Sequence, residues 1–393
     1  MGVLDGVRVL DFGRYIAGPF CAALLGDLGA EVVRIDNIEG GGDRNLMPAT
    51  EHGTGALFLQ VNRNKESITL DMSSDRGRAV ARRLIVQSDI IVANFPPSVL
   101  RRLGLDYPSL KAVKDDIILT TATAFGTDGP LADGIGFDGI GQAISGAIHL
   151  TGEPGKPYRA AVSYVDYATA IACAFGTLAA VIARMQTGKG GHVDGALVGT
   201  AMTMMNPMLI EEATGARSRV PTANRSPIAG PSDIFRTSDG WIIMQVIGQD
   251  MFARWTKLVG EEQLLGDPRF TDDMKRGDNG APLSAIMARW CADRTSEECL
   301  ALLRQSRIVA SPVLSPRQVL EKERLLADCF FDWIDLPGED RRIPIAKPMA
   351  RLATINPPER IPAPELGEDT DAVFTRFGFS TAEIAALRAD GVV

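Results

Sequence analysis

Short apolar runs alternate with helical patterns through the first half of the chain. The runs that predict strands, because β-branched and aliphatic residues dominate them, are Val7–Phe12, Glu31–Asp36, Ser67–Met72, Ile90–Phe95 and Ile117–Phe125. The segments between them, such as Gly18–Ala30, carry apolar residues at helical spacing. Near-continuous apolar strands separated by helices are typical of a parallel sheet covered on both faces. The pattern therefore predicts a Rossmann-like α/β domain.

The pattern changes after about residue 200. Gly215–Asp233 is polar and rich in Gly and Pro, which is typical of a linker or long loop. Ile234–Thr237 and Trp241–Ile247 flank a Ser-Asp-Gly turn and predict a hairpin. Helical patterns follow from Met251 to Gln305. A smaller α+β domain is therefore expected over residues 225–325.

The C-terminal region is expected to return to the first domain. Arg342–Pro364 contains several prolines, so it must run extended, as a strap across a surface. We therefore expect a large Rossmann-like domain over residues 1–200, completed by about residues 330–393.

Composition excludes several classes of protein. The 393 residues carry a formal net charge of −8, which argues against a nucleic-acid or anionic-membrane surface. Five cysteines without a CxxC pair, and three histidines without metal-ligand spacing, predict neither a disulfide framework nor a metal site. The N-terminus lacks a basic, apolar leader, and Tyr167–Ala183 is uncharged but too short to span a bilayer. A cytoplasmic protein with a buried helix there is expected.

Common nucleotide and nucleophile motifs are missing from the sequence. A dinucleotide-binding turn needs GxGxxG after the first strand, whereas "DFGRYIAGPF" offers Gly13 and Gly18 at the wrong spacing. Neither a phosphate-binding lysine loop nor a GxSxG elbow occurs. These observations make an NAD-dependent dehydrogenase or a serine hydrolase a weak hypothesis.

Asp166 is the carboxylate of most interest, because it precedes a long apolar helix. Its position predicts an N-cap, in which the side chain accepts backbone N–H groups of the first turn. The same position suits a nucleophile, since the helix N-terminus stabilises an anion that apolar neighbours keep away from water. The two roles are compatible, and position alone favours the cap.

Seven segments in order resemble the class III (CaiB/BaiF) CoA-transferase family, which includes α-methylacyl-CoA racemases. The strongest is "LDGVRVLDFGRYIAGPFCAALLGDLGAEVVRID" at the N-terminus. The others are Asn62–Met72, Ser88–Tyr107, Thr123–Pro130, Gly136–Gly146, Thr187–Leu197 and Pro364–Gly378. The resemblance covers nearly the whole chain and is weakest from Met205 to Asp233.

The resemblance implies an interlocked homodimer and a covalent mechanism. It places the catalytic nucleophile at Asp166, which would form a mixed anhydride with the acyl group and then an aspartyl-CoA thioester. Its substrates would be an acyl-CoA and a small carboxylic acid, without a tightly bound cofactor. The CoA-binding residues it implies are Ile16, Ala17, Arg34, Asn37, Leu70, Asp71, Met72, Ser73, Asn94, Phe95, Pro96, Arg102, Gly136 and Phe137.

Departures from the family pattern bear on specificity. Many relatives carry a basic residue at the position of Asn37, for which Arg34 is a candidate substitute. Racemases carry histidine at the position of Phe137, and a phenyl ring cannot move a proton. Ile16 stands where oxalate-specific members have glutamine, which argues against oxalate. Transfer is therefore favoured, while a 2-methylacyl-CoA racemase and a non-catalytic CoA-binding protein stay as alternatives.

Overall fold

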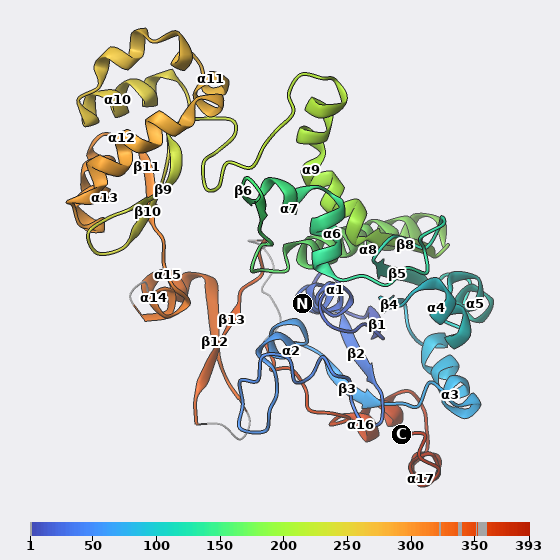
Figure 1. Cartoon of the computed structure of the whole chain (residues 1–393). Helices are drawn as coiled ribbons and strands as arrows, with labels where there is room; N and C mark the ends of the chain where they lie inside the picture. The colour runs from blue at the N-terminus through green and yellow to red at the C-terminus, as the bar shows by residue number, and fades with distance from the viewer. Residues whose placement is uncertain (1, 322–323, 337–339, 351, 353–359) are drawn as a thin grey trace. The chain divides into compact units, whose positions relative to one another are not determined.

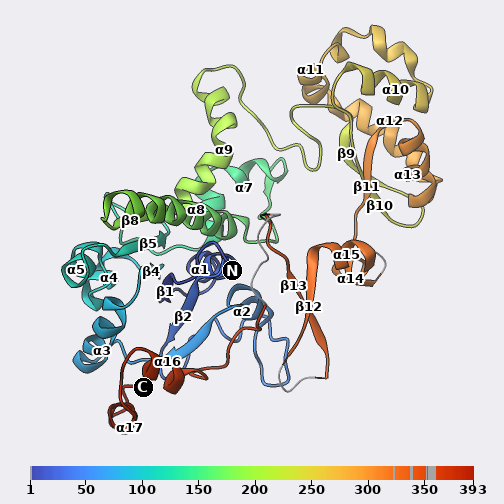
Figure 2. The same cartoon turned by 180° about the vertical axis from the view of Figure 1, so that it is seen from behind.

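The computed structural model describes residues 2–321, 324–336, 340–350, 352 and 360–393. These residues divide into two compact units (Figures 1 and 2). The first comprises Met1–Ser145, Ala161–Asn206 and Asp328–Val393, and the second Gly146–Ala160 and Pro207–Ala327. Residues 146–160, expected in the large domain, therefore group with the smaller unit.

The first unit is built on a parallel sheet in the order β3-β2-β1-β4-β5-β8. Its strands are β1 (Arg8–Asp11), β2 (Glu31–Asp36), β3 (Glu66–Thr69), β4 (Ile90–Ala93), β5 (Ile118–Thr123) and β8 (Gly191–Ala196). With β8 counted as the sixth strand, this is the order of a doubly wound nucleotide-binding fold. The predicted α/β class with a parallel sheet is therefore confirmed, and the five predicted strands are β1 to β5.

Helices cover both faces of this sheet because its strands are apolar on both sides. One face packs on α3 (Asp75–Val86), α5 (Tyr107–Val113), α16 (Thr370–Arg376) and α17 (Thr381–Ala389). The other packs on α1 (Ala17–Gly26) and α8 (Tyr164–Thr187). The unit also contains α2 (Ala56–Val61), α4 (Pro97–Leu103), α6 (Asp138–Ile144) and the hairpin of β12 (Phe331–Asp335) and β13 (Arg342–Ala346).

The C-terminal strap lies partly outside the described residues, which omit 351 and 353–359. Of the segment Arg342–Pro364, the start forms β13 and the end runs along the first unit. There the amide N of Ile361 donates to Oδ1 of Asn64, and Arg44 donates to the carbonyl of Pro364. These bonds join the last segment to the loops beside β3.

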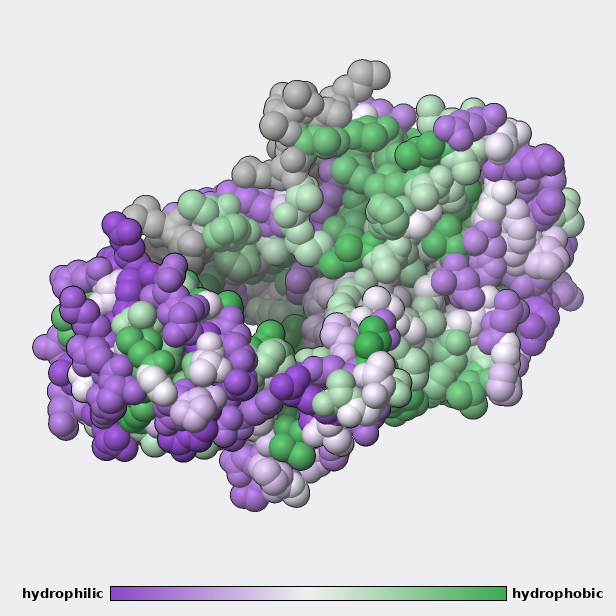
Figure 3. Space-filling view, turned by 90° about the horizontal axis from the view of Figure 1, so that it is seen from above, coloured by the Kyte–Doolittle hydropathy of each residue, from purple (hydrophilic) through white to green (hydrophobic). Residues whose placement is uncertain are grey.

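Helix α8 is long and apolar enough to cross a membrane by length and composition alone, the one such helix among residues the structure describes. One face packs against the sheet through residues such as Val165, Ala170 and Val181. The prediction of a buried helix therefore holds for this face only. The other face exposes Phe175 and Met185. Figure 3 shows hydrophobic side chains gathered over a broad area on the side where α8 and α9 (Leu197–Ala213) lie.

The second unit has its own core. The strands β9 (Ser232–Arg236), β10 (Trp241–Gln245) and β11 (Val309–Pro312) form an antiparallel sheet, which contains the predicted hairpin. Its helices are α7 (Ala147–Leu150), α10 (Gln249–Val259), α11 (Asp273–Asp278), α12 (Gly280–Ala292), α13 (Ser296–Gln305) and α14 (Pro316–Glu321). Trp255, Phe252 and Leu283 are fully buried where helices cover the sheet.

Candidate active site

The site is built at the carboxyl ends of β1 and β4, the neighbouring strands at the centre of the sheet. The chain leaves β1 toward β2 on one side and leaves β4 toward β5 on the other. This reversal opens a crevice at which ligands of doubly wound folds bind. Gly13 and Gly18 allow the β1–α1 loop to fold tightly there, because a Cβ on Gly13 would lie 2.8 Å from Cδ of Pro19.

Buried charges fix the β1–α1 loop. The Lys65 ammonium donates to Oδ2 of Asp11 at 2.7 Å and to the carbonyl of Pro19 at 2.7 Å. The other oxygen of Asp11 accepts the backbone N–H of Gly13 at 2.8 Å. Burial is the main reason that the pKa of Lys65 falls to about 8. The loop is thus tied to the sheet by an ion pair that water does not reach.

Tyr15 takes a left-handed backbone conformation, with φ of 63°. A bulky residue adopts this conformation only where its surroundings impose it. Its backbone N–H donates to Oδ2 of Asp43 at 3.2 Å, and the N–H of Arg14 donates to Oδ1 of Asn94 at 2.8 Å. The Asn94 amide returns a bond to the carbonyl of Arg14 at 2.7 Å. These bonds hold the turn against the end of β4.

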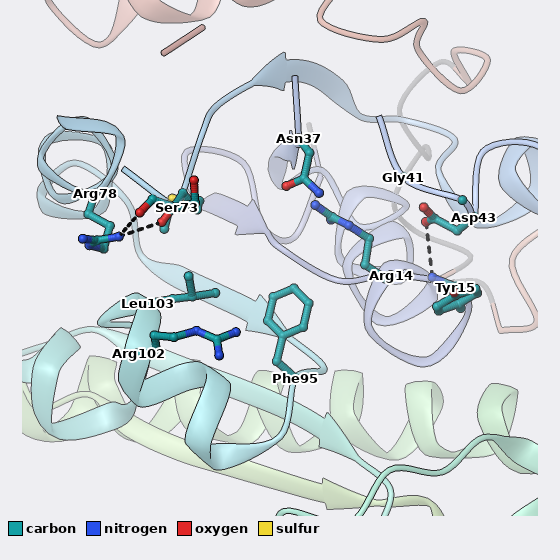
Figure 4. A pocket seen from close by; sticks show the side chains of 12 residues that line it. Arg14, Tyr15, Asn37, Gly41, Asp43, Ser73, Arg78, Phe95, Arg102 and Leu103 are labelled. Carbon is teal, nitrogen blue, oxygen red and sulfur yellow. Dashed lines mark hydrogen bonds between the residues drawn. The ribbon is translucent and has the colours of Figure 1, made fainter. Parts of the chain in front are cut away.

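An outer groove of about 680 Å³ runs along this turn (Figure 4). Its lining consists of Arg14, Tyr15, Asn37, Gly41, Gly42, Asp43, Met72, Ser73, Arg78, Phe95, Arg102 and Leu103. Figure 4 shows Arg78 and Arg102 on one side and Arg14 with Asn37 on the other. Three guanidinium groups around one groove suit the phosphates of an anionic ligand.

An inner pocket of about 210 Å³ adjoins the groove, since Arg14, Tyr15 and Phe95 line both. The inner pocket is lined besides by Ile16, Ala17, Asn94, Pro96, Ala122, Thr123, Ala124, Gly134, Ile135, Gly136, Phe137, Asp166 and Leu197. Asp166 supplies the carboxylate group in this lining. A ligand that begins at the arginines of the groove can therefore extend to the carboxyl group of Asp166.

Asp166 does not cap its helix, so that prediction is wrong. Helix α8 begins at Tyr164, its N-cap position is Ser163, and Ser163 makes no side-chain capping bond. The carboxylate of Asp138, the first residue of α6, takes that role from a distance. Its Oδ1 accepts the backbone N–H of Val165 at 2.8 Å and that of Asp166 at 3.4 Å. The carboxyl group of Asp166 is thereby left for the pocket.

The environment of Asp166 disfavours its charged form. Burial first, and the nearby charge of Asp138 second, raise its pKa to about 7. Asp138 faces a different environment, because Oδ2 accepts a bond from the Gln142 amide while Oδ1 accepts the two backbone groups. Two neighbouring carboxylates in unlike environments are typical of sites where one of them performs the chemistry.

Most of the predicted CoA-binding residues line these two cavities. The groove includes Asn37, Met72, Ser73 and Arg102, and the inner pocket includes Ile16, Ala17, Asn94, Pro96, Gly136 and Phe137, with Phe95 in both.

Three predicted CoA-binding residues line neither cavity. Arg34 is fully buried and pairs with Asp36 at 3.0 Å and with Asp43 at 2.8 Å, so it does not replace a basic residue at position 37. Leu70 is fully buried in the core beside the sheet. The Asp71 carboxylate turns to Ser73, accepting both its backbone N–H and its hydroxyl.

Sequence reasoning missed several residues of the site, among them Arg14, Tyr15, Arg78 and Asp138. Arg14 and Tyr15 lie in the best-matched segment, and Asp138 directly follows Phe137, so adjacency was the available signal. Arg78 carried no signal, because a basic residue in an amphipathic helix is usually solvated; here it donates to the carbonyls of Met72 and Ser73 beside the groove. Among the described residues, no group of three or more His, Cys, Asp or Glu could hold a metal ion.

Comparison with known proteins identifies the family of this chain. Residues 4–370 match the model of CoA-transferase family III. Succinyl-CoA–D-citramalate CoA-transferase of Chloroflexus aurantiacus is 30% identical, covering 99% of this chain and 98% of that protein. Succinate–glutarate CoA-transferase of Agrobacterium fabrum is 30% identical over 93% of each chain. The crystal structure of a CaiB/BaiF family protein from Brucella suis superposes with a TM-score of 0.83 at 30% identity, covering 96% of this chain and 99% of that one. The chain belongs to CoA-transferase family III and is a class III CoA-transferase.

Proposed function

We propose that this member of CoA-transferase family III moves coenzyme A between two carboxylic acids, with Asp166 as the covalent nucleophile. One observation carries the proposal: the groove with three arginines and the pocket with Asp166 share the wall of Arg14, Tyr15 and Phe95. The arginines bind the phosphates of CoA, and the pantetheine arm passes Phe95 toward the inner pocket. The thioester then reaches the carboxylate.

The first half of the reaction loads CoA onto the enzyme. The Asp166 carboxylate attacks the thioester carbonyl carbon, the C–S bond breaks, and CoA leaves as a thiolate while a mixed anhydride forms. The thiolate attacks the Asp166 carbonyl carbon of the anhydride and expels the donor acid as its carboxylate. An aspartyl-CoA thioester remains. A thiolate is a good leaving group, so a carboxylate nucleophile suffices.

The second half repeats these steps with the acceptor acid. Its carboxylate attacks the aspartyl-CoA thioester, releases the thiolate and forms a new anhydride. The thiolate attacks the acceptor's acyl carbon, which gives the product thioester and restores the Asp166 carboxylate. The raised pKa of Asp166 supports this role, because a more basic carboxylate is a stronger nucleophile once ionised.

A 2-methylacyl-CoA racemase remains the second candidate on family grounds. It needs two acid–base groups on opposite sides of the α-carbon. Phe137, which lines the pocket with Asp166, cannot exchange a proton, and the carboxylate of Asp138 is engaged by α8 and Gln142. The pocket therefore favours transfer.

Trapping of the enzyme-bound acyl group tests the mechanism. Incubation with an acyl-CoA and hydroxylamine should convert Asp166 to a hydroxamate, seen as a mass change on its peptide. Asp166→Asn should abolish both the adduct and transfer, whereas Asp115→Asn, an exposed carboxylate on the surface, should change neither. Transfer that survives in Asp166→Asn would contradict the mechanism, and proton exchange at the α-carbon without transfer would support the racemase.

We also propose that the enzyme works as an interlocked homodimer in the cytoplasm. The exposed apolar face of α8, with Ile171, Phe175, Ile182 and Met185, supports a partner surface, since monomers rarely expose such a contiguous patch. The five cysteines are free thiols, which fits a reducing compartment. Light scattering should give a dimer mass that Phe175→Glu lowers. A wild-type monomer would contradict the dimer.

A further inference from the structure

Tyr15 and Phe137 form an aromatic pair in the wall of the inner pocket. Their rings meet edge to face, with centroids 5.5 Å apart and an interplanar angle of 84°. Both remain accessible, at 40% for Tyr15 and 56% for Phe137. Ligand pockets are lined by apolar and aromatic side chains of this kind, and exposed rings leave contact area for a ligand.

The chain holds one of these rings in place through an uncommon backbone conformation. The left-handed turn at Tyr15 is fixed by the Asp43 carboxylate and by the paired bonds between Asn94 and Arg14. Such conformations concentrate at ligand sites, where the surrounding structure imposes them. The turn therefore fixes the direction in which the Tyr15 side chain leaves the backbone at the pocket wall.

Three polar side chains of the inner pocket, those of Asn94, Thr123 and Arg14, make hydrogen bonds within the chain. Asn94 is bonded to the backbone of Arg14, and the Thr123 hydroxyl accepts the N–H of Gly126 at 2.9 Å. The Arg14 guanidinium donates to backbone carbonyls at 2.8 to 3.0 Å, and Figure 4 shows it directed toward Asn37 in the groove. The carbonyls are those of Phe12, Gly13 and Ile35.

A second carboxylate on the acyl group would enter this pocket beside Asp166 at a cost. Its charge would lose water and stand beside the Asp166 carboxylate, and two like charges in a desolvated pocket disfavour each other. An uncharged acyl group would instead gain contact with the two rings. The described lining thus discriminates between the two kinds of acid.

We propose that the inner pocket selects donors whose acyl group is apolar and uncharged, aryl above all, and seats that group against the Tyr15–Phe137 pair. The inference rests on the proposed transfer and narrows it to a substrate class. It also separates this chain from the relatives whose names contain succinyl-CoA or succinate.

Binding to Asp166→Asn tests the selection without turnover. We expect phenylacetyl-CoA to bind at least about tenfold more tightly than succinyl-CoA by calorimetry, with acetyl-CoA between them, because the rings add contact for only one of the three. Removing the Asp166 charge favours succinyl-CoA, so the test is strict. Equal or tighter binding of succinyl-CoA would overturn the proposal. Because binding needs no turnover, a protein that prefers phenylacetyl-CoA yet transfers nothing would fail the proposed function alone.

Substitutions that remove either aromatic ring test whether the rings contact the acyl group. Phe137→Ala, and Tyr15→Gly, which keeps the left-handed turn, should each lower the affinity ratio of phenylacetyl-CoA to acetyl-CoA by about tenfold. Phe137→Leu keeps an apolar wall and should lower this ratio less. Both thioesters carry the same pantetheine, so an unchanged ratio would place the rings on the pantetheine arm and overturn the proposal.

Discussion

The Asp138 carboxylate accepts the backbone N–H of Asp166 at 3.4 Å, while the side chain of Asp166 lines the inner pocket. One carboxylate thus caps the helix that carries the other. The division of roles has an electrostatic consequence, because the charge of Asp138 adds to burial in raising the pKa of Asp166 to about 7. Removing that charge while keeping the cap separates the two contributions.

Asp138→Asn should move the acidic limb of the pH profile of kcat/KM to lower pH. The amide oxygen can still accept the N–H groups of Val165 and Asp166, but the negative charge that raises the pKa of Asp166 is gone. The other titratable groups in reach are Tyr164 and Tyr167, whose own pKa values are raised, so they stay neutral near pH 7. An unmoved or upward-shifted limb would contradict the coupling. Asp138→Ala, which also removes the cap, should lose stability as well.

The wild-type enzyme should gain activity as pH rises through about 7. The nucleophile acts as the carboxylate, and below its pKa of about 7 most of Asp166 is protonated. Rates of transfer at subsaturating acyl-CoA, measured from about pH 5 to about pH 9, should therefore show one ionisation on the acidic side. A profile that is flat between those limits would show that Asp166 is not the group that limits the rate.

Asp166→Asn should be more stable than the wild type at pH 8. The folded-state pKa is raised to about 7 from the ordinary value of 3.8, so the folded wild type binds more protons between these values. Its stability therefore falls as pH rises through that window, by an amount of the order of a few kcal/mol, since one pKa unit is worth ~1.4 kcal/mol. Asparagine carries no such penalty. The difference in Tm between variant and wild type should shrink at pH 4.

Arg102→Gln should weaken CoA binding by about tenfold or more, because a charged hydrogen bond to phosphate contributes ~1.5–3 kcal/mol. The adjacent Arg101 is a matched control, since it lies outside the groove and approaches Asp133 at 3.7 Å. Arg101→Gln should leave the Kd of CoA unchanged in calorimetry at fixed salt. Equal losses in the two variants would point to the general charge of α4 rather than to a phosphate contact.

The strands and the sheet class could be predicted because local pattern determines them. Glu31–Asp36 forms a strand with the predicted bounds, since the β-branched residues Val32, Val33 and Ile35 favour an extended, buried segment. The strand β8 was not predicted, because its sequence "GHVDGA" has no continuous apolar run. It lies at the edge of the sheet, where it pairs with β5 alone and needs no such run. The Pro-rich strap was predicted as extended, and its described ends fit that prediction.

The sequence by itself determined the parallel α/β fold, the position of Asp166 at the start of a long helix, and five of the twelve groove-lining residues. Only the tertiary structure decided the environment of each side chain. Arg34 and Arg78 look alike in sequence, yet one is buried between carboxylates and the other lines the groove. Asp138 caps a helix that begins at Tyr164, far along the chain. Burial, ion pairing and pKa depend on neighbours that folding brings together, and local periodicity carries no record of them.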